Sequence, residues 1–322
     1  MDSLYTKLLR TIRNVASGVG SASTPITMVL NKDYLVSEFV LKLAVTQGFA
    51  TTAPTSSDVR DFIDEVSLEV SGGAQSGKVF TLTGAQFYDL GRLTESAPAP
   101  VVSLGATSTA VFSNEAHMEM DGLDYDLHTA LRSGDYSTIT MRISFNADTA
   151  NGFKGGTIGA GAAAVYTASV EAYCYPSMTP KTPEDKAAVT QGSLAHRTDA
   201  QTLAIAATGN QADIRLKTGN LTRFIAFHTR NGAGALTDGI IGNLRLSVAG
   251  VDGDVRDIPF TSVQAENAVK RGLALTGVGV LDFGDSLAGL LDLHDCNEAK
   301  IQWDALATGS ICLLYTSDAA DE

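Results

Sequence analysis

The chain has little cysteine, tryptophan and proline: its 322 residues include 3 cysteines, 1 tryptophan and 8 prolines. Cys174, Cys296 and Cys312 are well separated in the sequence, and no two of them have CxxC spacing. So few thiols do not make a disulfide framework. With 44% hydrophobic residues, the chain can bury one large core or two ordinary ones.

Positive charge and long apolar runs are also scarce. Lysine and arginine number 23 against 36 aspartates and glutamates, which gives a net charge of −13 at pH 7. Such an acidic chain does not suit sequence-independent binding of nucleic acid, which needs clustered positive charge. No apolar run approaches the roughly 18 residues of a membrane-spanning helix. Charges are spread over residues 1–13, so we expect no secretory signal there.

The last residues of the chain need separate treatment. CLLYTSDAADE, Cys312–Glu322, can be back-translated into a sequence that resembles the transposase adapter used to prepare sequencing libraries. We therefore expect that residues 312–322 are translated adapter and that the natural sequence is interrupted after about Ile311. Without them the chain has 33 acidic residues and a net charge of 23 − 33 = −10. Artefactual ends are excluded from fold reasoning.

No stretch of the sequence carries a complete catalytic motif. GGAQSGKV, residues 72–79, has Gly72, Gly77 and Lys78 at P-loop spacing, but Val79 stands where a magnesium-binding hydroxyl is needed. The stretch also leads into a strand-like run, whereas a P-loop leads into a helix. It predicts a glycine-rich hairpin loop. GxSxG is absent and no Ser/His/Asp set stands out, so we expect no enzyme.

The histidines and aspartates do not form a metal-binding motif either. The five histidines lack HxH and HExxH spacing, and structural roles are expected for His117, His128, His196, His228 and His294. Aspartates gather in DGLDYDL (121–127) and VDGDVRD (251–257) without EF-hand register, which favours turn capping, with a weak surface calcium site as the alternative. A glycosidase needs two carboxylates close together in space, and the sequence singles out no pair. We predict no cofactor and no metal.

The clearest positive signal is a strand that occurs twice. In EVSLEVSGG (65–73) the apolar residues alternate with polar ones, and a glycine pair ends the run. NLRLSVAGV (243–251) has the same build 178 positions later, with glycine again following. The apolar face consists of Val66, Leu68 and Val70 in the first copy and of Leu244, Leu246 and Val248 in the second. One such match can arise by chance, but several matching segments in the same order indicate a duplicated domain.

The neighbourhood does match, in the same order along the chain. VSEFVLKLAV (36–45) corresponds to TRFIAFHT (222–229), with Phe39 aligned with Phe224. VFTLTGAQFYDLGRL (79–93) corresponds to IPFTSVQAENAVKRGL (258–273), with Phe80 aligned with Phe260. Both members of the second pair begin extended and then become helix-like.

A fourth pair completes the repeat. LHTALRSGDYSTITMRI (127–143) corresponds to LAGLLDLHDCNEAKIQW (287–303), which aligns Leu131 with Leu291, Met141 with Ile301 and Ile143 with Trp303. The separations run 185, 178, 180 and 160, and the last is smaller because the first copy carries an insertion around residues 94–108. Shifts that fall in loops are typical of a duplicated domain.

The repeat divides the chain into parts. We expect a first domain at 26–178, a proline-rich linker at 179–200 and a second domain at 201–311. Many short alternating runs with Gly/Asn/Asp turns, and few short helices, favour an all-β sandwich or barrel. After Ile143 the first copy continues to another strand, VYTASVEAYCY, whereas only DALATGSI follows Trp303 before the adapter-like residues. The second domain is therefore expected to lack its last strand.

The amino terminus, 1–25, is a basic segment on an acidic protein. Leu4, Leu8, Ile12 and Val15 fall on one helical stripe, and glycines at 18 and 20 follow. This spacing predicts a basic amphipathic helix. Either the helix packs on its own domain, or it meets anionic lipid, nucleic acid or a neighbouring subunit. The residues expected to face lipid or a partner are Leu4, Lys7, Leu8, Arg10, Ile12 and Arg13.

Taken together, these features resemble the double jelly-roll major capsid proteins of tailless icosahedral viruses, notably phages with an internal membrane. The resemblance covers residues 1–311 and rests on the duplicated segments, the proline-rich linker at 179–200 and the basic amino-terminal arm at 1–25, without a signature motif. It implies two tandem eight-stranded jelly rolls, the second truncated, with short helices and an N-terminal amphipathic helix. The helix-like stretches at 84–93 and 264–273 resemble the short helix that such rolls carry beside a strand.

The resemblance also implies a function and partners. Three chains would form a pseudo-hexagonal capsomer in the shell of the virion, made in the host cytoplasm. Further partners would be minor capsid and penton proteins, with the internal membrane or genome meeting the arm. Two alternatives stay open: a phage spike or adhesin that binds carbohydrate, and a double jelly-roll enzyme that cleaves glycans. Those should show aromatic platforms or converging acidic and aromatic residues, and the chain has one tryptophan, Trp303.

Overall fold

The computed structural model divides the chain into two compact units. The first comprises Met1–Asp121 and Tyr125–Ser193, and the second comprises Gly122–Asp124 and Leu194–Glu322. The structure describes residues 11–20, 24–30, 34–48, 63–72, 76–94, 101–104, 109–119, 131–133, 136–145, 165–176, 195–210, 214–249, 255–283, 290–293 and 296–319. Most of the expected linker, 179–194, lies outside these residues, and a strand of the second unit already begins at Ala195.

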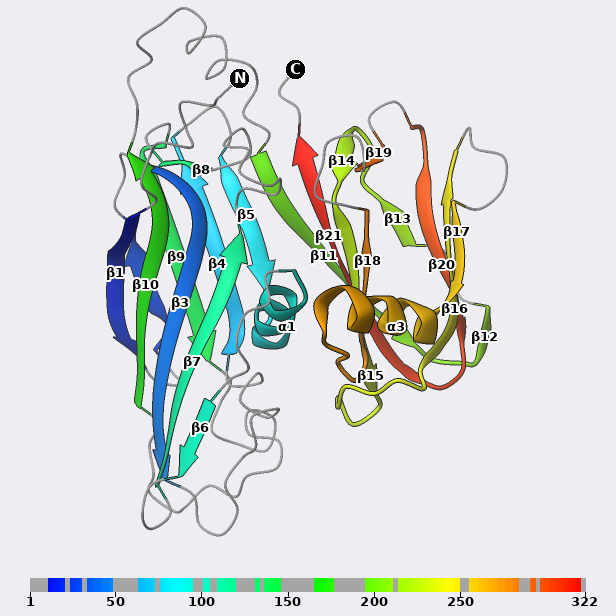
Figure 1. The fold of residues 1–322 in the computed structure, drawn as a ribbon, viewed down its shortest axis with the longest axis horizontal. Helices are drawn as coiled ribbons and strands as arrows, with labels where there is room; N and C mark the ends of the chain where they lie inside the picture. Colours follow the sequence, from blue (N-terminus) through cyan, green and yellow to red (C-terminus); the bar gives the residue numbers. More distant parts are fainter. Residues whose placement is uncertain are drawn as a thin grey trace, which may run out of the picture. The chain divides into compact units, whose positions relative to one another are not determined.

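The first unit contains two antiparallel sheets (Figure 1). One sheet has the strand order β1-β10-β3-β7-β6, and β8 pairs with the start of β3. Its strands are β1 (Thr11–Gly20), β3 (Tyr34–Gly48), β6 (Val101–Leu104), β7 (Thr109–Glu119), β8 (Leu131–Arg132) and β10 (Val165–Pro176). The other sheet has the order β5-β4-β9-β2. Its strands are β2 (Ile26–Val29), β4 (Ile63–Ser71), β5 (Gly77–Leu82) and β9 (Thr138–Phe145), and helix α1 (Gly84–Thr94) follows β5.

The second unit is built in the same way. Its first sheet has the order β11-β21-β15-β18, and β14 pairs with β21 and β19. These strands are β11 (Ala195–Ile205), β14 (Asn220–Thr222), β15 (Phe224–Asn231), β18 (Val278–Asp282), β19 (Leu291–Asp292) and β21 (Gly309–Ala319). In the second sheet β17 pairs with β16 and β16 with β20, and β20 carries β12 and β13 at its other edge. Its members are β12 (Gly209–Asn210), β13 (Ile214–Leu216), β16 (Ile241–Val248), β17 (Arg256–Pro259) and β20 (Ala299–Ala305), and helix α3 (Phe260–Arg271) follows β17.

The strand pairings of the two units correspond one to one. In the first sheets, β1-β10-β3-β7 corresponds to β11-β21-β15-β18, and in the second sheets β5-β4-β9-β2 corresponds to β17-β16-β20-β13. Helices α1 and α3 both follow the strand at one edge of the second sheet. The repeat seen in the sequence is therefore a repeat of topology.

The agreement extends to individual residues. In β4 and β9, Val66 lies opposite Ile143, Leu68 opposite Met141 and Val70 opposite Ile139. In β16 and β20, the residues 178 and 160 positions later make the same pairs: Leu244 with Trp303, Leu246 with Ile301 and Val248 with Ala299. All twelve side chains are buried, because alternate residues of these strands face the core. The two alignments made from the sequence are confirmed for this sheet.

One aligned pair is wrong. Phe80 lies in strand β5, whereas Phe260 is the first residue of helix α3. The registers of the neighbouring strands show the shift, since Val66 lies opposite Leu82 and its counterpart Leu244 lies opposite Ile258. Two phenylalanines at similar places suggested an alignment that the backbone does not follow. Both are buried, Phe80 against Phe87 and Phe260 against Phe227.

The expected amphipathic helix is wrong where the structure describes the segment. Residues 11–20 form strand β1, which pairs with β10 along its length; Ile12 lies opposite Tyr173 and Arg13 opposite Ala172. A free strand edge supplies backbone partners for the whole segment, and this outweighs a local helical pattern that already contains poor helix formers such as Asn14, Gly18 and Gly20. Leu4, Lys7, Leu8 and Arg10 lie outside the described residues.

The expectation that the second unit lacks its last strand is also wrong for this chain. Strand β21 occupies that position and pairs with both β11 and β15. Leu313 and Tyr315 are fully buried in the core, as is Ile311 before them, so the adapter-like residues continue the alternation that the position needs. The coding origin of residues 312–322 is a separate matter and stays a prediction.

Tryptophan fluorescence can test the core of the second unit, because Trp303 is the one tryptophan of the chain and is buried there. Leu246→Ala removes a fully buried side chain opposite Ile301. We expect it to lower the free energy of unfolding by about 2–5 kcal/mol. Ser247→Ala, the neighbouring and partly exposed position, should change it by less than about 0.5 kcal/mol. Urea denaturation followed by fluorescence measures both, and equal effects would contradict the assigned faces of β16.

Candidate functional site

The P-loop-like stretch is the turn of a β-hairpin. Strand β4 ends at Ser71, β5 begins at Gly77, and Val70 pairs with Gly77 across the turn. Lys78 lies in β5 and forms an exposed ion pair with Glu65 at 3.7 Å. Gly72 has a positive φ of 76°, and a Cβ there would collide with Ser137. The glycine serves the turn, and the predicted hairpin is confirmed.

The histidines and aspartates that the structure describes lie apart. His117 lies in β7, His196 in β11 and His228 in β15, where His228 is buried opposite Cys312. Asp257 lies in β17, 3.9 Å from Arg245. Among the described residues, no three His, Cys, Asp or Glu side chains gather where they could hold a metal ion. His128, His294, Asp121, Asp124, Asp126, Asp252 and Asp254 lie outside those residues.

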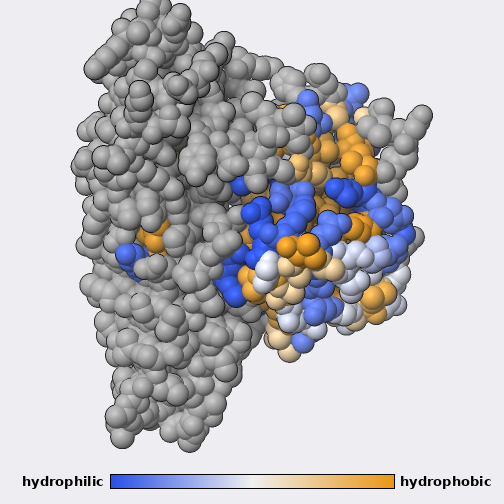
Figure 2. Space-filling model, in the orientation of Figure 1, coloured by the Kyte–Doolittle hydropathy of each residue, from blue (hydrophilic) through white to orange (hydrophobic). Residues whose placement is uncertain are grey.

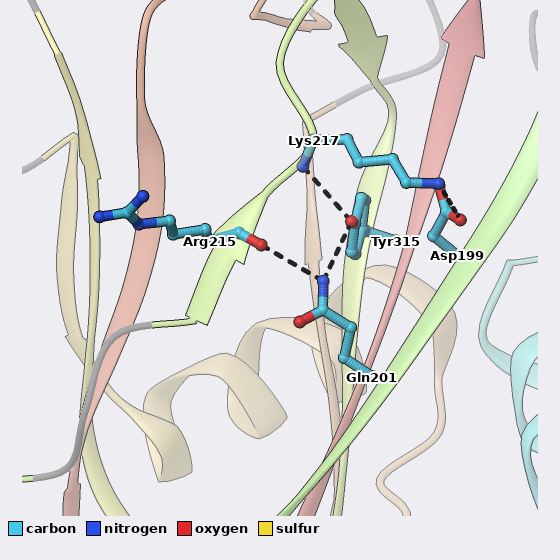
Figure 3. A network of polar contacts seen from close by, with 5 residues as sticks. All are labelled: Asp199, Gln201, Arg215, Lys217 and Tyr315. Carbon is cyan, nitrogen blue, oxygen red and sulfur yellow. Dashed lines mark hydrogen bonds and ion pairs between the residues drawn. The ribbon is translucent and has the colours of Figure 1, made fainter.

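A polar network links the two sheets of the second unit at one side of the sandwich (Figure 3). Tyr315 of β21 accepts hydrogen bonds at its hydroxyl from Gln201 of β11 and from the backbone N–H of Lys217, both at 3.3 Å. Gln201 also donates to the backbone carbonyl of Arg215 in β13, at 3.2 Å. Because β13 belongs to one sheet and β11 to the other, these bonds close the side of the sandwich.

This network stabilises the fold of the second unit. Asp199 and Lys217 form an ion pair at 2.5 Å, but the Lys217 side chain is 60% exposed, so the pair contributes little. The Tyr315 hydroxyl is buried and satisfied by two donors. A buried phenol needs such partners, and here they come from strands of both sheets.

Helix α3 closes the free edge of strand β18. The side-chain amide of Asn267 donates to the carbonyl of Val280 and accepts from the N–H of Val280, each at 2.8 Å. Asn267 is buried, and it occupies the place that a further strand would take. Open edges invite pairing with another chain, so this edge is protected by a side chain. Gly279 is required beside it, because a Cβ there would lie 2.7 Å from the Phe260 ring.

The first unit closes the equivalent edge by a different means. Strand β6, which lies in the insertion at 94–108, pairs with β7 through Val101–Leu104. The insertion therefore supplies a strand where the second unit supplies an asparagine. As a result, the two units differ on a side that their shared topology would otherwise make alike.

Helix α3 also fixes the loop between β15 and β16. Gln264 donates to Asp238 at 2.6 Å, and Asp238 accepts the N–H of Gly277 at 2.6 Å. Within the loop, Asn231 accepts from the backbone N–H groups of Ala233 and Ala235. Hydrogen bonds thus join the loop to the helix.

The outer face of α3 exposes an apolar side chain. Val269 is 87% exposed, whereas Phe260, Val263 and Asn267 on the opposite face are buried. In the view of Figure 2, orange hydrophobic and blue hydrophilic side chains lie next to each other over the second unit. The sequence indicated this helix, and its 3.6-residue period places Val269 opposite Phe260 and Asn267. Of the described helices, neither is long and apolar enough to cross a membrane.

Comparisons with known proteins identify the fold. No protein-family model and no curated protein sequence matches the chain. Solved structures do match over almost the whole length. The major capsid protein of Sulfolobus turreted icosahedral virus superposes with a TM-score of 0.72 and 16% sequence identity, covering 95% of this chain and 96% of that one. The major capsid protein of bacteriophage PM2 has a TM-score of 0.60 and 11% identity, covering 96% of this chain and 98% of that one.

A third match comes from the capsid of the virus PBCV-1, with a TM-score of 0.64, 12% identity and coverage of 96% and 94%. At such identities the matches show a common fold and leave function to be argued. The chain has the double jelly-roll fold that these capsid proteins share, as the sequence predicted.

The closed edge of β18 gives a prediction for stability. Asn267→Leu has a similar volume but leaves the N–H and carbonyl of Val280 buried without their partners. We expect the free energy of unfolding of the second unit to fall by about 2–4 kcal/mol. Lys270→Ala, exposed on the same helix, should change it by less than about 0.5 kcal/mol. Urea denaturation followed by Trp303 fluorescence measures both variants. A near-neutral Asn267→Leu would show that the edge is held by other contacts.

Proposed function

We propose that the chain is a structural protein, the major capsid protein of an icosahedral virus. The observation that carries this proposal is the presence of two rolls with the same strand pairings and the same core register in one chain. A catalyst has no need of two such bodies. A shell subunit does, because each roll presents a similar side to its neighbours.

Three chains then form a homotrimer with six similar corners, and such pseudo-hexagonal capsomers tile the lattice of the virion shell. Their contacts bury more than about 1,000 Å² per pair, since a shell must survive dilution. The protein is made in the host cytoplasm and acts in the virion. Minor capsid and penton proteins are its further partners.

The amino-terminal segment faces the inside of the shell, toward an internal membrane or the genome. Strand β1 belongs to the first roll, so this part of the proposal narrows to residues 1–10. There Lys7 and Arg10 supply positive charge and Leu4 and Leu8 supply apolar surface, on a chain that is otherwise acidic. Lysine and arginine beside apolar residues suit an anionic lipid surface.

The alternative functions find less support. A carbohydrate-binding adhesin uses exposed aromatic platforms, but the one tryptophan, Trp303, is 2% exposed and packs in the core. A glycan-cleaving enzyme needs paired carboxylates. In the second sheet of the second unit, Asp257 and Asp304 both lie within ion-pairing distance of Arg245.

Self-association of the purified chain tests the proposal. At micromolar concentration, analytical ultracentrifugation should show trimers, and negative-stain images should show hexagonal outlines. The reason is that two similar rolls in each of three chains make six corners. A chain that stays monomeric at every salt concentration and pH, or that turns over a glycan substrate, would contradict it.

Vesicle binding tests the role of the amino-terminal segment. The full chain should bind vesicles that contain anionic lipid, and Leu8→Asp should weaken this binding, because it removes apolar surface and adds a repelled charge. Binding to neutral vesicles serves as the control. Equal binding of the two proteins would leave the segment a protein-facing or genome-facing role.

A further inference from the structure

Strand β2 leaves one edge of the second sheet of the first unit open. It pairs with β9 on one side, and in the part of the chain that the structure describes no strand pairs with its other side. The N–H of Leu30 donates to the carbonyl of Ile139 in β9, at 2.8 Å. Bonded and non-bonded residue pairs alternate in an antiparallel ladder, so Met28 also bonds to β9. The N–H and C=O groups of Thr27 and Val29 therefore point to the open edge.

This open edge is exposed and carries no charge. Thr27 and Val29 are both exposed, and Val29 leaves 66% of its surface in water. No residue from 24 to 30 is charged. Proteins commonly protect an edge strand with charged side chains or proline, which prevent other strands from pairing with it. Pro25 precedes β2, so it blocks neither Thr27 nor Val29.

The corresponding sheet of the second unit carries charged residues at both edges. In β13, the counterpart of β2, the side chain of Arg215 is 81% exposed, and Lys217 follows with 60%. At the other edge, β17 contains the exposed Arg256 and Asp257 and ends at Pro259. Two copies of β13 side by side would bring like charges together, whereas two copies of β2 would not.

We propose that β2 pairs with β2 of a second copy of this chain, antiparallel about a twofold axis at Met28. In this register Thr27 lies opposite the partner's Val29, and Val29 lies opposite the partner's Thr27. Both are pairs whose backbone groups point at each other, so the contact forms about four hydrogen bonds. Two open residues on either side of a bonded one make the edge complementary to itself, as a twofold contact between identical chains requires.

Charge favours a second copy as the occupant. Two chains that each carry a net charge of −13 repel one another, so they approach closely only where local charge does not add to this repulsion. Strand β2 is uncharged, and Arg142, the charged residue of β9, lies one strand further in, opposite Thr27. Pairing covers part of the exposed Val29 without burying a charge.

A contact of four residues is weak in isolation, because backbone hydrogen bonds supply most of its free energy. Repetition makes such a contact effective, since linked copies bind their neighbours at a high effective concentration. A twofold contact does not close a threefold ring. In the shell that we propose it therefore joins one capsomer to the next, and this placement alone rests on the proposed function.

Disulfide crosslinking tests the register. Residues opposite each other in a bonded pair have Cα atoms about 5.5 Å apart, which a disulfide can span. A mixture of Thr27→Cys chains with Val29→Cys chains should give at least about tenfold more crosslinked dimer under mild oxidation than either chain alone, because equal positions lie farther apart than a disulfide reaches. The wild-type chain, with its three cysteines, gives the background. No excess crosslinking in the mixture would overturn the pairing.

A proline at the edge tests the hydrogen bonds. Val29→Pro removes an N–H that points to the open edge and keeps the bonds between β2 and β9, as edge strands tolerate. We expect unchanged thermal unfolding and a dissociation constant of the pairing at least about tenfold higher, measured on the full chain by analytical ultracentrifugation. Val29→Thr is the matched control, because it keeps the N–H and a β-branched side chain and should associate like the wild type. Equal association of both variants would contradict the proposed bonds.

The pairing of β2 and the capsid proposal fail separately. Val29→Pro should leave trimers intact, because the edge of β2 serves the twofold contact and not the ring. If trimers form but the cysteine mixture gives no excess crosslinking, the pairing is wrong and the capsid proposal stands. If the mixture crosslinks but no trimer forms at any salt concentration and pH, the capsid proposal is wrong and the pairing stands. Should Val29→Pro lower the unfolding temperature, the crosslinking result decides.

Discussion

The structure depends on the register between the central strands of the second sheet in each unit. Leu68 opposite Met141, and Leu246 opposite Ile301, set which residues of those strands face the core. A slip by one residue would turn every apolar side chain outward, so the register is strongly specified. Once it is set, the neighbouring strands pair at fixed positions and the helix that follows the edge strand is placed. The same register in both units is what makes the two rolls equivalent.

The two rolls close equivalent strand edges, those of β7 and β18, by different means. The first unit adds β6 beside β7, and the second uses the amide of Asn267 to bond the backbone of Val280. Both remove a free strand edge, which would otherwise pair with other chains without specificity. With that edge closed, the contacts between copies that we propose in the capsomer would depend on side chains, and side chains can be specific for one partner.

The sequence alone predicted the all-β class, the duplication and the residue pairs of β4 with β16 and β9 with β20, because alternation and spacing are local signals. The sequence-based prediction failed at three places where contacts with distant residues determine the local structure. Residues 11–20 have a helical pattern but join the edge of β10. Residues 312–319 are adapter-like but complete β21. Phe80 and Phe260 look alike but lie in a strand and in a helix. In each case pairing or packing with distant residues outweighed the local pattern. The outer face of α3 was missed because exposure depends on what covers a helix, and no periodicity records that.

The two rolls are alike inside and different outside, and this difference has a consequence for assembly. At equivalent core positions the residue stays apolar, as in Leu68 and Leu246 or Ile143 and Trp303. At equivalent outward positions the residue changes from apolar to charged. Val29, which lies opposite Thr140 in the first roll, corresponds to Arg215, which lies opposite Lys300 in the second. Both of these side chains are largely exposed. Identical rolls could form six identical contacts and give a true hexamer of single rolls. In the capsomer that we propose, unlike surfaces on a common core would let each roll distinguish its neighbours, which favours a ring of three chains.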